Sequence, residues 1–142
     1  MYRHILIPTD GSEQAEHGVA HGLALAKSLR AKVSVIFVLE AFSEVTGRML
    51  EAVAKYAELR KDQATSVLAR AANAAKEAGV SCETIQVENP QPHQAIIAAA
   101  EDKGCDLIVM SSHGRSGLSV LLIGSVTNKV LTQAKTPVLV CP

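Results

Sequence analysis

The sequence predicts an α/β protein, in which an open parallel sheet of five strands is covered by helices on both faces. Five short β-rich runs alternate with four helical segments along the chain. The second of these runs, residues 32–39, is apolar at nearly every position, which is typical of a strand buried on both faces of a sheet. No linker, repeat or low-complexity stretch interrupts the 142 residues. We therefore expect right-handed βαβ crossovers within a single domain, residues 1–142.

The first strand and the first helix are separated by a short turn. Residues 3–8 form a β-rich run that ends at a proline, and residues 10–12 supply a turn and an N-cap. Residues 13–30 are the first helix, and residues 32–39 follow as the second strand. The apolar positions of this helix recur at helical spacing: Val19, Leu23, Ala26 and Leu29.

A long alanine-rich helix follows a connection near residues 43–47. Gly79 is expected to end it as the C′ residue. Residues 81–87 alternate as the third strand, and residues 93–103 form a third helix that Gly104 closes. The positions of the long helix that repeat at three and four are Val53, Tyr56, Arg60, Ala64, Val67, Ala71 and Ala74.

The last third of the chain repeats the alternation. Residues 106–110 are the fourth strand, and a loop rich in Gly and Ser follows from Ser111 to about Gly117. A fourth helix is expected to run from there to Ala134, and residues 137–141 form the final strand.

Composition excludes several classes of function. The 14 Lys and Arg residues balance the 14 Asp and Glu residues, and no run of like charge appears, so neither nucleic acid nor an acidic membrane is an expected partner. Two Phe, two Tyr and no Trp leave too few aromatic rings for a platform that stacks bases. Because the longest apolar stretches are strand-sized and no signal-peptide pattern begins the chain, we expect a soluble, cytoplasmic protein.

Neither cysteine nor histidine spacing indicates a metal site. Cys82, Cys105 and Cys141 are odd in number and widely spaced, and they form no CxxC pair, so we expect buried or edge thiols. His17 and His21 stand one helical turn apart, but no third ligand lies near them in the sequence. We expect both histidines on the surface.

Ligand-binding residues are expected in two loops. In an open parallel sheet, ligands bind beyond the carboxyl ends of the strands, where the strand order reverses. The loops at such ends are residues 8–12 and residues 111–117, and the start of the fourth helix adds backbone amides that hold anions. Phosphate is the expected ligand, while the alternative is that Gly and Ser make only a flexible surface loop. The glycines and basic side chains that suit phosphate are Gly114, Gly117, Gly124, His113 and Arg115.

Several sequence fingerprints are absent. The first strand is not followed by GxGxxG, and GxxxxGK[ST] occurs nowhere, which disfavours a dinucleotide enzyme and a P-loop NTPase. The chain also lacks the GxSxG and HExxH motifs, so hydrolase and metalloprotease activities have no support.

Two segments at opposite ends of the chain resemble the universal stress protein family. Residues 110–127, followed by residues 137–140, look like its C-terminal half, and residues 4–12 look like its first strand and loop. ATP-binding members carry Gly, two residues, Gly, nine residues, and then Gly followed by Ser or Thr. Here Gly114 and Gly124-Ser125 fit that pattern, whereas Ser111 stands at the first Gly and adds a Cβ where the family's backbone passes close to the nucleotide.

The resemblance implies the sheet order 3-2-1-4-5 and an adenine nucleotide, ATP with Mg²⁺, lying across strands 1 and 4. One group of residues would line the nucleoside end: Pro8, Thr9, Asp10 and the backbone of Val38, which would meet adenine. A second group would flank the ribose and the first phosphates: Met110, Ser111 and Gly114. A third group would hold the distal phosphates: Gly124, Ser125, Val126 and Thr127.

Three of these candidates have simpler interpretations. Asp10 could make only an Asx turn or a cap before the first helix, and Ser125 could be only a cap at a helix start. His113 could be an exposed loop residue rather than a phosphate contact.

The last strand is expected at an edge of the sheet, since residues 136–142 are short and apolar, with Pro137 at the start. The family resemblance implies that this edge pairs with a second copy to form a homodimer, while the alternative is an edge shielded by the terminus. In such a dimer Cys141 would lie near the two-fold axis, where oxidation could form an intersubunit disulfide.

We therefore expect a homodimeric, ATP-binding regulatory or protective module of the stress response. Any ATP hydrolysis should be slow, because the chain lacks a Walker-type Lys and offers no evident base beyond Asp10 or His113. The alternative is a dimeric interaction scaffold of the same fold that binds no nucleotide. A third possibility, an enzyme of the related α-hydrolase-like fold, requires an SGGxDS or HxGH motif that is absent here.

Overall fold

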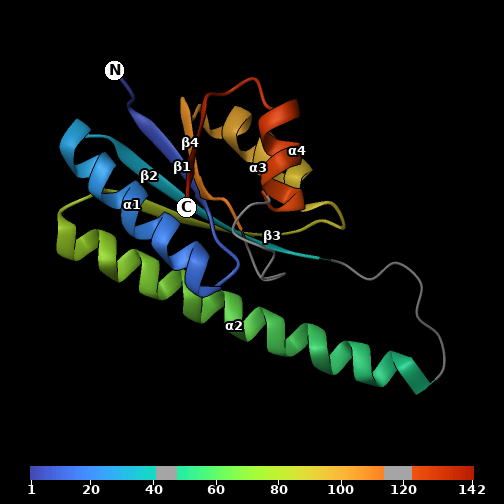
Figure 1. Ribbon diagram of the computed structural model, residues 1–142. Coiled ribbons are helices and arrows are strands. Elements are labelled where there is room, and N and C mark those ends of the chain that lie inside the picture. Colours follow the sequence, from blue (N-terminus) through green and yellow to red (C-terminus); the bar gives the residue numbers. More distant parts are fainter. Residues whose placement is uncertain (41–47, 114–122) are drawn as a thin grey trace.

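A computed structural model describes residues 1–40, 48–113 and 123–142. Its sheet has five parallel strands: β1 (His4–Pro8), β2 (Lys32–Leu39), β3 (Cys82–Glu88), β4 (Leu107–Ser111) and β5 (Val138–Cys141). They are arranged in the order β3-β2-β1-β4-β5 (Figure 1). Both the predicted fold class and the predicted strand order are confirmed.

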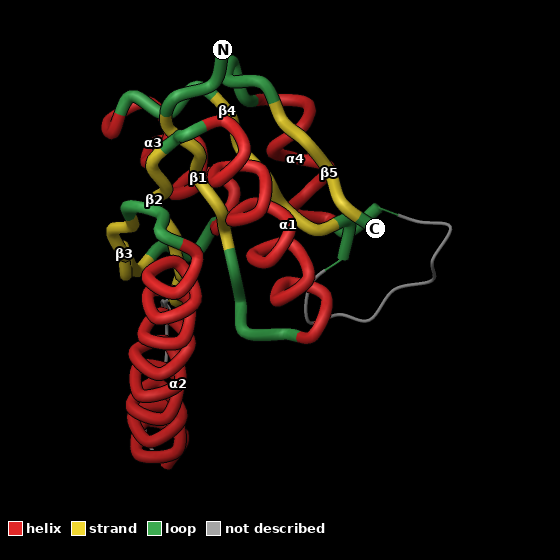
Figure 2. The backbone as a smooth tube through the Cα atoms, turned by 90° about the vertical axis from the view of Figure 1, so that its left-hand side faces the viewer, coloured by secondary structure: helices red, strands yellow, loops and turns green. Residues whose placement is uncertain are grey.

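In the part of the chain that the structure describes, four helices cover the sheet, two on each face. They are α1 (Glu13–Leu29), α2 (Arg48–Ala78), α3 (Pro92–Lys103) and α4 (Ser125–Gln133). Helices α1 and α2 lie on one face, and α3 and α4 lie on the other (Figures 1 and 2). Among the described residues, no helix is both long enough and apolar enough to cross a membrane.

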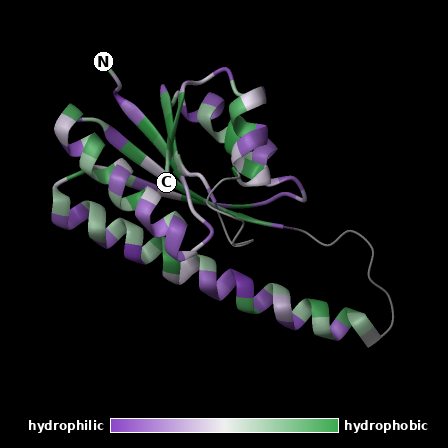
Figure 3. Cartoon of the chain, in the orientation of Figure 1, coloured by the Kyte–Doolittle hydropathy of each residue, from purple (hydrophilic) through white to green (hydrophobic). Residues whose placement is uncertain are grey.

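The core consists of two layers that the sheet separates. Ile5 and Ile7 of β1 point toward α1 and α2, whereas Leu6 points toward α3 and α4. All three side chains are completely buried, as Figure 3 reflects in the apolar colouring of the central strands. A strand covered on both faces needs apolar residues at successive positions, and this explains why β1 and β2 are apolar runs rather than alternating ones.

Local side-chain chemistry sets the helix ends where the sequence predicted them. The Ser12 hydroxyl accepts a hydrogen bond from the Ala15 N–H at 3.1 Å, so Ser12 is the N-cap of α1. Helix α2 ends at Ala78, and Gly79 follows with a φ of +73°, a left-handed conformation that glycine adopts without strain. The described helices and strands thus begin and end within about two residues of the predicted bounds, with one exception.

That exception is α4, for which the sequence predicted a start after about residue 117, with a start at Gly124-Ser125 as the alternative. The helix begins at Ser125, and Ile123 and Gly124 are not helical. Gly124 has an extended conformation, with φ −58° and ψ 152°, because its N–H donates to the Ser112 carbonyl at 2.6 Å. That bond ties the residue before α4 to the end of β4, so the helix starts at the later of these two positions.

Helix α2 is far longer than the strands that it covers. Its 31 residues rise about 46 Å, whereas the eight residues of β2 extend about 26 Å. The side chains buried against the sheet come from its second half, beginning with Ala64. The first half therefore projects beyond the carboxyl ends of the strands, as Figures 1 and 2 show.

A chain of polar side chains crosses the opposite, amino end of the sheet. His4 Nε2 lies 2.7 Å from Ser34 Oγ, and that hydroxyl donates to Glu83 Oε1 at 2.9 Å. The Asp106 carboxylate accepts the backbone N–H groups of Arg3 and His4 at 2.9 and 3.0 Å. These bonds hold the first residues of β1 to β2 and to the start of β4.

Three of these hydrogen-bonded side chains have pKa values below their ordinary ones. Burial lowers the pKa of His4, and nearby Lys32 acts in the same direction. The hydrogen bond from Ser34 lowers the pKa of Glu83. Burial by itself raises the pKa of Asp106, but the two backbone N–H groups outweigh it and the pKa is lowered. The folded protein therefore binds protons less readily at these groups than the unfolded chain does.

We predict that the free energy of unfolding falls as the pH falls, in two steps. The first step begins near pH 6.5, the ordinary pKa of histidine, because the unfolded chain then takes up a proton that folded His4 resists. The second begins near pH 4.5, where Glu83 and then Asp106 become protonated in the unfolded chain. Urea unfolding measured across this pH range tests the prediction. A His4→Gln variant should lack the first step, and an unchanged first step in that variant would contradict it.

Candidate functional site

A cavity of about 720 Å³ opens at the carboxyl end of the sheet, where the strand order reverses between β1 and β4. This is the position predicted from the sequence. Residues from β1, β2, β3 and β4 and from all four helices surround it. The volume lies in the range of pockets that bind small molecules.

The floor of the cavity is apolar. Ile36 and Ile96 are buried, Val38 is half-buried, and Met110 is almost completely buried, and all four belong to the core layer under α3 and α4. These side chains come from β2 and β4, the strands on either side of β1, and from the first half of α3. Such a surface suits a flat, weakly polar group such as a base.

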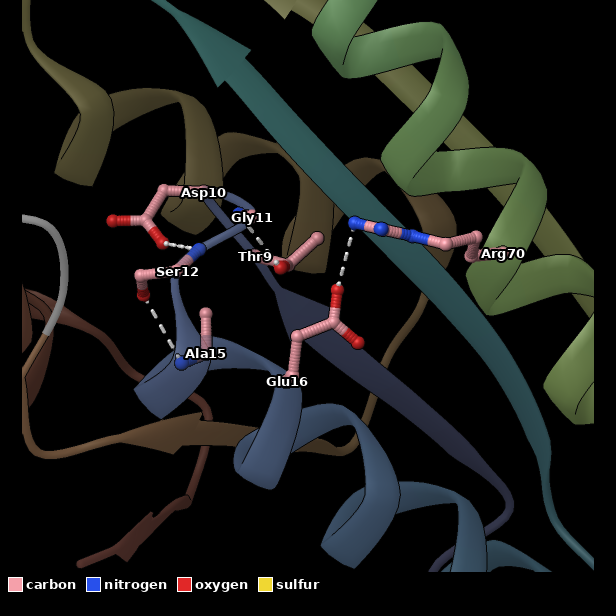
Figure 4. Close-up of polar contacts among 7 residues, drawn as sticks. All are labelled: Thr9, Asp10, Gly11, Ser12, Ala15, Glu16 and Arg70. Carbon is pink, nitrogen blue, oxygen red and sulfur yellow. Dashed lines mark hydrogen bonds and ion pairs between the residues drawn. The ribbon is translucent and has the colours of Figure 1, made fainter.

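The loop between β1 and α1 forms one polar wall, shown in Figure 4. The N–H of Ser12 donates to Asp10 Oδ1 at 2.9 Å, which confirms the Asx turn, and the N–H of Gly11 donates to Thr9 Oγ1 at 3.2 Å. Asp10 also lines the cavity, so its turn-forming role does not remove its carboxylate from the site. Farther along α1, Glu16 pairs with Arg70 of α2 at 3.2 Å.

Backbone groups of β2 face the cavity at Val38. Strand β1 ends at Pro8, which pairs with Ile36, and the N–H of Thr9 donates to the Ile36 carbonyl at 2.9 Å. Alternate residues of a strand bond to the same neighbour, so the N–H and carbonyl of Val38 point to the side that β1 has just left. A donor and an acceptor are thereby presented side by side above the apolar floor.

Hydrogen bonds join the end of β4 to the start of α4 on the other side of the cavity. The Thr127 hydroxyl donates to the Ser111 carbonyl at 2.9 Å, and the Ser112 carbonyl accepts the Gly124 N–H. The Ser111 hydroxyl donates to the His113 carbonyl at 2.6 Å, and Ser112 Oγ lies 2.9 Å from His113 Nδ1. The half-buried His113 is therefore part of this network rather than an exposed loop residue.

The side chain of Ser111 points away from the cavity floor. Ser111 follows Met110 on β4, and successive residues of a strand face opposite sides of the sheet. A Cβ built on Gly18 of α1 would lie 3.2 Å from the Ser111 nitrogen and 3.6 Å from its Cβ. The glycine in α1 thus leaves room for the serine at the position where the family motif has glycine.

The start of α4 also faces the cavity. Gly124 is the N-cap and Ser125 is the first helical residue, so the interpretation of Ser125 as the cap is wrong. Within the described chain, no side chain caps this end. Because the first N–H groups of a helix lack intrahelical partners and carry partial positive charge, this end of the cavity suits an anion.

No metal centre is found in the described parts of the chain, where no group of three or more His, Cys, Asp or Glu residues is placed to hold an ion. His17 and His21 are exposed on α1, as expected. Cys105 and Cys141 are buried, Cys82 is half-buried, and all three are free thiols.

Comparison with known proteins identifies the family. A model of the universal stress protein family matches residues 1–142. The chain belongs to this family. Universal stress protein MJ0531 of Methanocaldococcus jannaschii is 36% identical over 141 residues, which cover 99% of this chain and 82% of that protein.

Solved structures agree with this assignment. Universal stress protein UspA from Lactobacillus plantarum superposes with a TM-score of 0.89 at 20% identity, covering 99% of this chain and 98% of that one, and so supports the fold. A universal stress protein in complex with cAMP has a TM-score of 0.70 at 25% identity, covering 99% and 96% of the two chains.

Most candidate residues of this universal stress protein line the same cavity. They are Pro8, Thr9, Asp10, Val38, Met110, Ser111, His113, Gly124, Ser125, Val126 and Thr127. Gly114, Arg115 and Gly117 lie outside the described residues. Three residues of α2 that no sequence motif predicted also line the cavity: Tyr56, Arg60 and Lys61. The spacing of Tyr56 and Arg60 predicted one long helix and no role in a site.

Proposed function

We propose that this universal stress protein binds ATP with Mg²⁺ and acts as a cytoplasmic, homodimeric module that regulates or protects during stress. The observation that carries the proposal is one cavity with a backbone donor and acceptor at one end and a helix N-terminus at the other. A base is complementary to the first of these ends, and a phosphate chain is complementary to the second. The three free thiols fit a reducing compartment.

The base end suits adenine. The Val38 N–H can donate to a ring nitrogen, while the Val38 carbonyl can accept from the exocyclic amine, so the two groups together read an edge that has one acceptor and one donor. Ile36 and Met110 supply apolar contact from below. The complex of a relative with cAMP supports an adenine nucleotide as the ligand class.

The phosphate end suits the distal phosphates. Backbone N–H groups of Ser125, Val126 and Thr127 begin α4, and the Ser125 side chain is exposed at the same place. Mg²⁺ would arrive with the phosphates, since it is commonly held by substrate oxygens, water and one or two carboxylates. Asp10 is the carboxylate in the β1–α1 loop that could contribute.

Hydrolysis of the bound ATP should be slow. A general base must reach the attacking water, and the candidates, Asp10 and His113, already make hydrogen bonds within their own loops. Nucleotide binding would therefore act mainly by ordering the loops around the cavity.

Calorimetric titration with Mg²⁺ and ATP tests the proposal, after nucleotide released by denaturing the purified protein has been analysed. We expect ATP binding, and Ser125→Ala should weaken it roughly fivefold or more because a phosphate contact is lost. Ser111→Gly should leave the Kd close to that of the parent, since the Ser111 side chain points away from the cavity floor. Thr132→Ala, an exposed hydroxyl farther along α4, is the matched control.

The competing proposal is a dimeric scaffold of the same fold that binds no nucleotide. If Ser111 blocks the site, the parent protein gives no heat with ATP and releases no nucleotide, while Ser111→Gly gains binding. That result would overturn the ATP proposal and favour the scaffold.

Strand β5 supports the homodimer. The carbonyls of Pro137 and Cys141 accept the N–H groups of Ile108 on β4 and of Ser112 directly after it. The backbone groups of Val138 and Val140 therefore point outward, along the free edge of the sheet. Cys141 is buried in the α1 and α2 layer, and burial raises the pKa of its thiol, both of which disfavour the intersubunit disulfide. Light scattering should therefore give the mass of two chains with or without reductant.

A further inference from the structure

The projecting half of α2, residues 48–63, contacts the core near its C-terminal end, where Arg60 lies over the ring of Phe37. From Met49 to Gln63 every side chain is exposed or half-buried, whereas Ala64, Val67 and Leu68 are buried. A helix of this length is marginally stable in water without tertiary contacts. Contacts to the inner face of residues 48–63 therefore strongly influence how well this part of the helix is ordered.

The inner face of this half is turned to the cavity. Its residues at relative positions 0, 3, 4, 7 and 8 line the cavity, and this is the spacing of one face of a helix: Val53, Tyr56, Ala57, Arg60 and Lys61. Leu59, on another face, is 64% exposed and does not line the cavity. The helix thus presents a defined surface to whatever the cavity holds.

This surface closes the end of the cavity that lies over β2 and β3. Its neighbours among the lining residues include Glu40, next to β2, and Glu88, the last residue of β3, which pairs with Lys61 at 3.4 Å. Strands β4 and β5 lie toward the opposite edge of the sheet, and the start of α4 lies there with them. In the proposed orientation of ATP, the surface on α2 faces the base and not the phosphates.

Two side chains give the surface its chemistry. Tyr56 is 44% exposed, and among the described residues that line the cavity it supplies the phenol ring. The Arg60 guanidinium lies 5.1 Å from the centre of the buried Phe37 ring, and its Nη1 donates to Gln63 Oε1 at 2.5 Å. Arg60 is therefore fixed next to β2, while the ring of Tyr56 offers apolar area to a base.

We propose that the inner face of residues 53–61 is a fourth wall of the nucleotide site, in which Tyr56 contacts the base, so that nucleotide binding orders the projecting half of α2. The inference rests on the proposed binding of ATP and adds to it a set of residues outside the family motif. It predicts that the contribution of Tyr56 depends on the base and not on the phosphates.

Tyrosine fluorescence provides a direct test, because the chain has two Tyr residues and no Trp. In a Tyr2→Phe variant Tyr56 is the sole fluorophore, and ATP should change its emission with a midpoint equal to the calorimetric Kd. Tyr2 precedes β1 at the opposite end of the sheet, so a Tyr56→Phe variant, which retains only Tyr2, should show no saturable change.

Affinity measurements separate a base contact from a structural effect. Tyr56→Ala should raise the Kd for ATP roughly tenfold, the usual scale for removing an aromatic contact with a base, and should leave the Kd for tripolyphosphate unchanged. Tyr56→Phe keeps the ring and should retain the parental affinity for ATP. Leu59→Ala, on the same part of α2 but outside the cavity, is the matched control. ATP should also slow amide hydrogen exchange in residues 48–63.

The possible failures can be told apart. If ATP binds to the parent protein but neither the emission of Tyr56 nor the Kd of Tyr56→Ala changes, the wall on α2 is wrong and the ATP site stands. Equal losses of affinity for ATP and tripolyphosphate in Tyr56→Ala would also overturn the base contact. If the parent protein binds no ATP, both proposals fail.

Discussion

Gly22→Val should destabilise the protein by about 3 kcal/mol, the upper part of the range for overpacking a core. A Cβ built on Gly22 would lie 2.9 Å from Cγ1 of Ile7, closer still to its Cδ1, and 3.5 Å from Cγ1 of Val109. Both neighbours are completely buried on central strands, so they have no free space into which to move. Urea unfolding should show a lower midpoint, and thermal unfolding should occur roughly 10 °C lower.

The expected loss at Gly22 exceeds what helix propensity can offset. Replacing a glycine within a helix gains at most about 1 kcal/mol of backbone entropy. Ala20→Val on the exposed side of α1 adds a similar volume without a core contact and is the control, with a change of about 0.5 kcal/mol. In the background of Gly22→Ala, Ile7→Val should cost less than it does alone, because it removes the crowded Cδ1. Additive costs, or a stable Gly22→Val protein, would show that α1 can shift outward.

The fold was predictable because each strand and helix carries a local signal. The apolar runs of β1 and β2 predict burial on both faces, Ser12 predicts the start of α1, and Gly79 predicts the end of α2. These signals involve residues that are close together in the sequence. The sheet order came instead from the family resemblance, since alternation alone leaves several orders open.

The sequence left two positions open for the start of α4, one directly after Gly117 and one at Gly124-Ser125. The extended backbone of Gly124 depends on the bond between its N–H and the carbonyl of Ser112, a contact across the intervening loop. The direction of the Ser111 side chain also depends on a contact between distant segments, because it is set by which face of β4 meets Gly18 of α1. Such contacts depend on tertiary structure, and a single sequence does not contain a local signal for them.

The two halves of α2 show a limit of a different kind. Val53, Tyr56 and Arg60 continue the spacing of Ala64 and Val67, so periodicity places all of them on one face of the helix. That conclusion is correct, but the face meets the sheet only where a strand lies beneath it. The 31 residues of the helix are far longer than a strand of eight residues, so half of this face must extend past the sheet.

Gly11→Val should have an effect of similar size, and it should reach the candidate site as well as the stability. Gly11 has a φ of +81°, in the left-handed region, where a residue with a Cβ costs roughly 1–2 kcal/mol. Its Cβ would lie 2.9 Å from Cγ2 of Val67 on α2. We therefore expect a total loss of about 3 kcal/mol in the free energy of unfolding.

The same substitution should weaken ATP binding, because the turn at Gly11 positions Thr9 and Asp10 against the cavity. Two comparisons separate the causes. Gly11→Asn and Gly11→Ala both place a Cβ against α2, but Asn tolerates the left-handed backbone better than Ala does. If backbone strain dominates, Gly11→Asn should therefore lose less stability than Gly11→Ala. Val67→Ala removes the methyl group that is in the way and should rescue part of the loss in Gly11→Val if the contact dominates. Unfolding and calorimetry on all four proteins decide between these causes. Parental stability and affinity in Gly11→Val would mean that the loop between β1 and α1 adapts freely and does not fix the site.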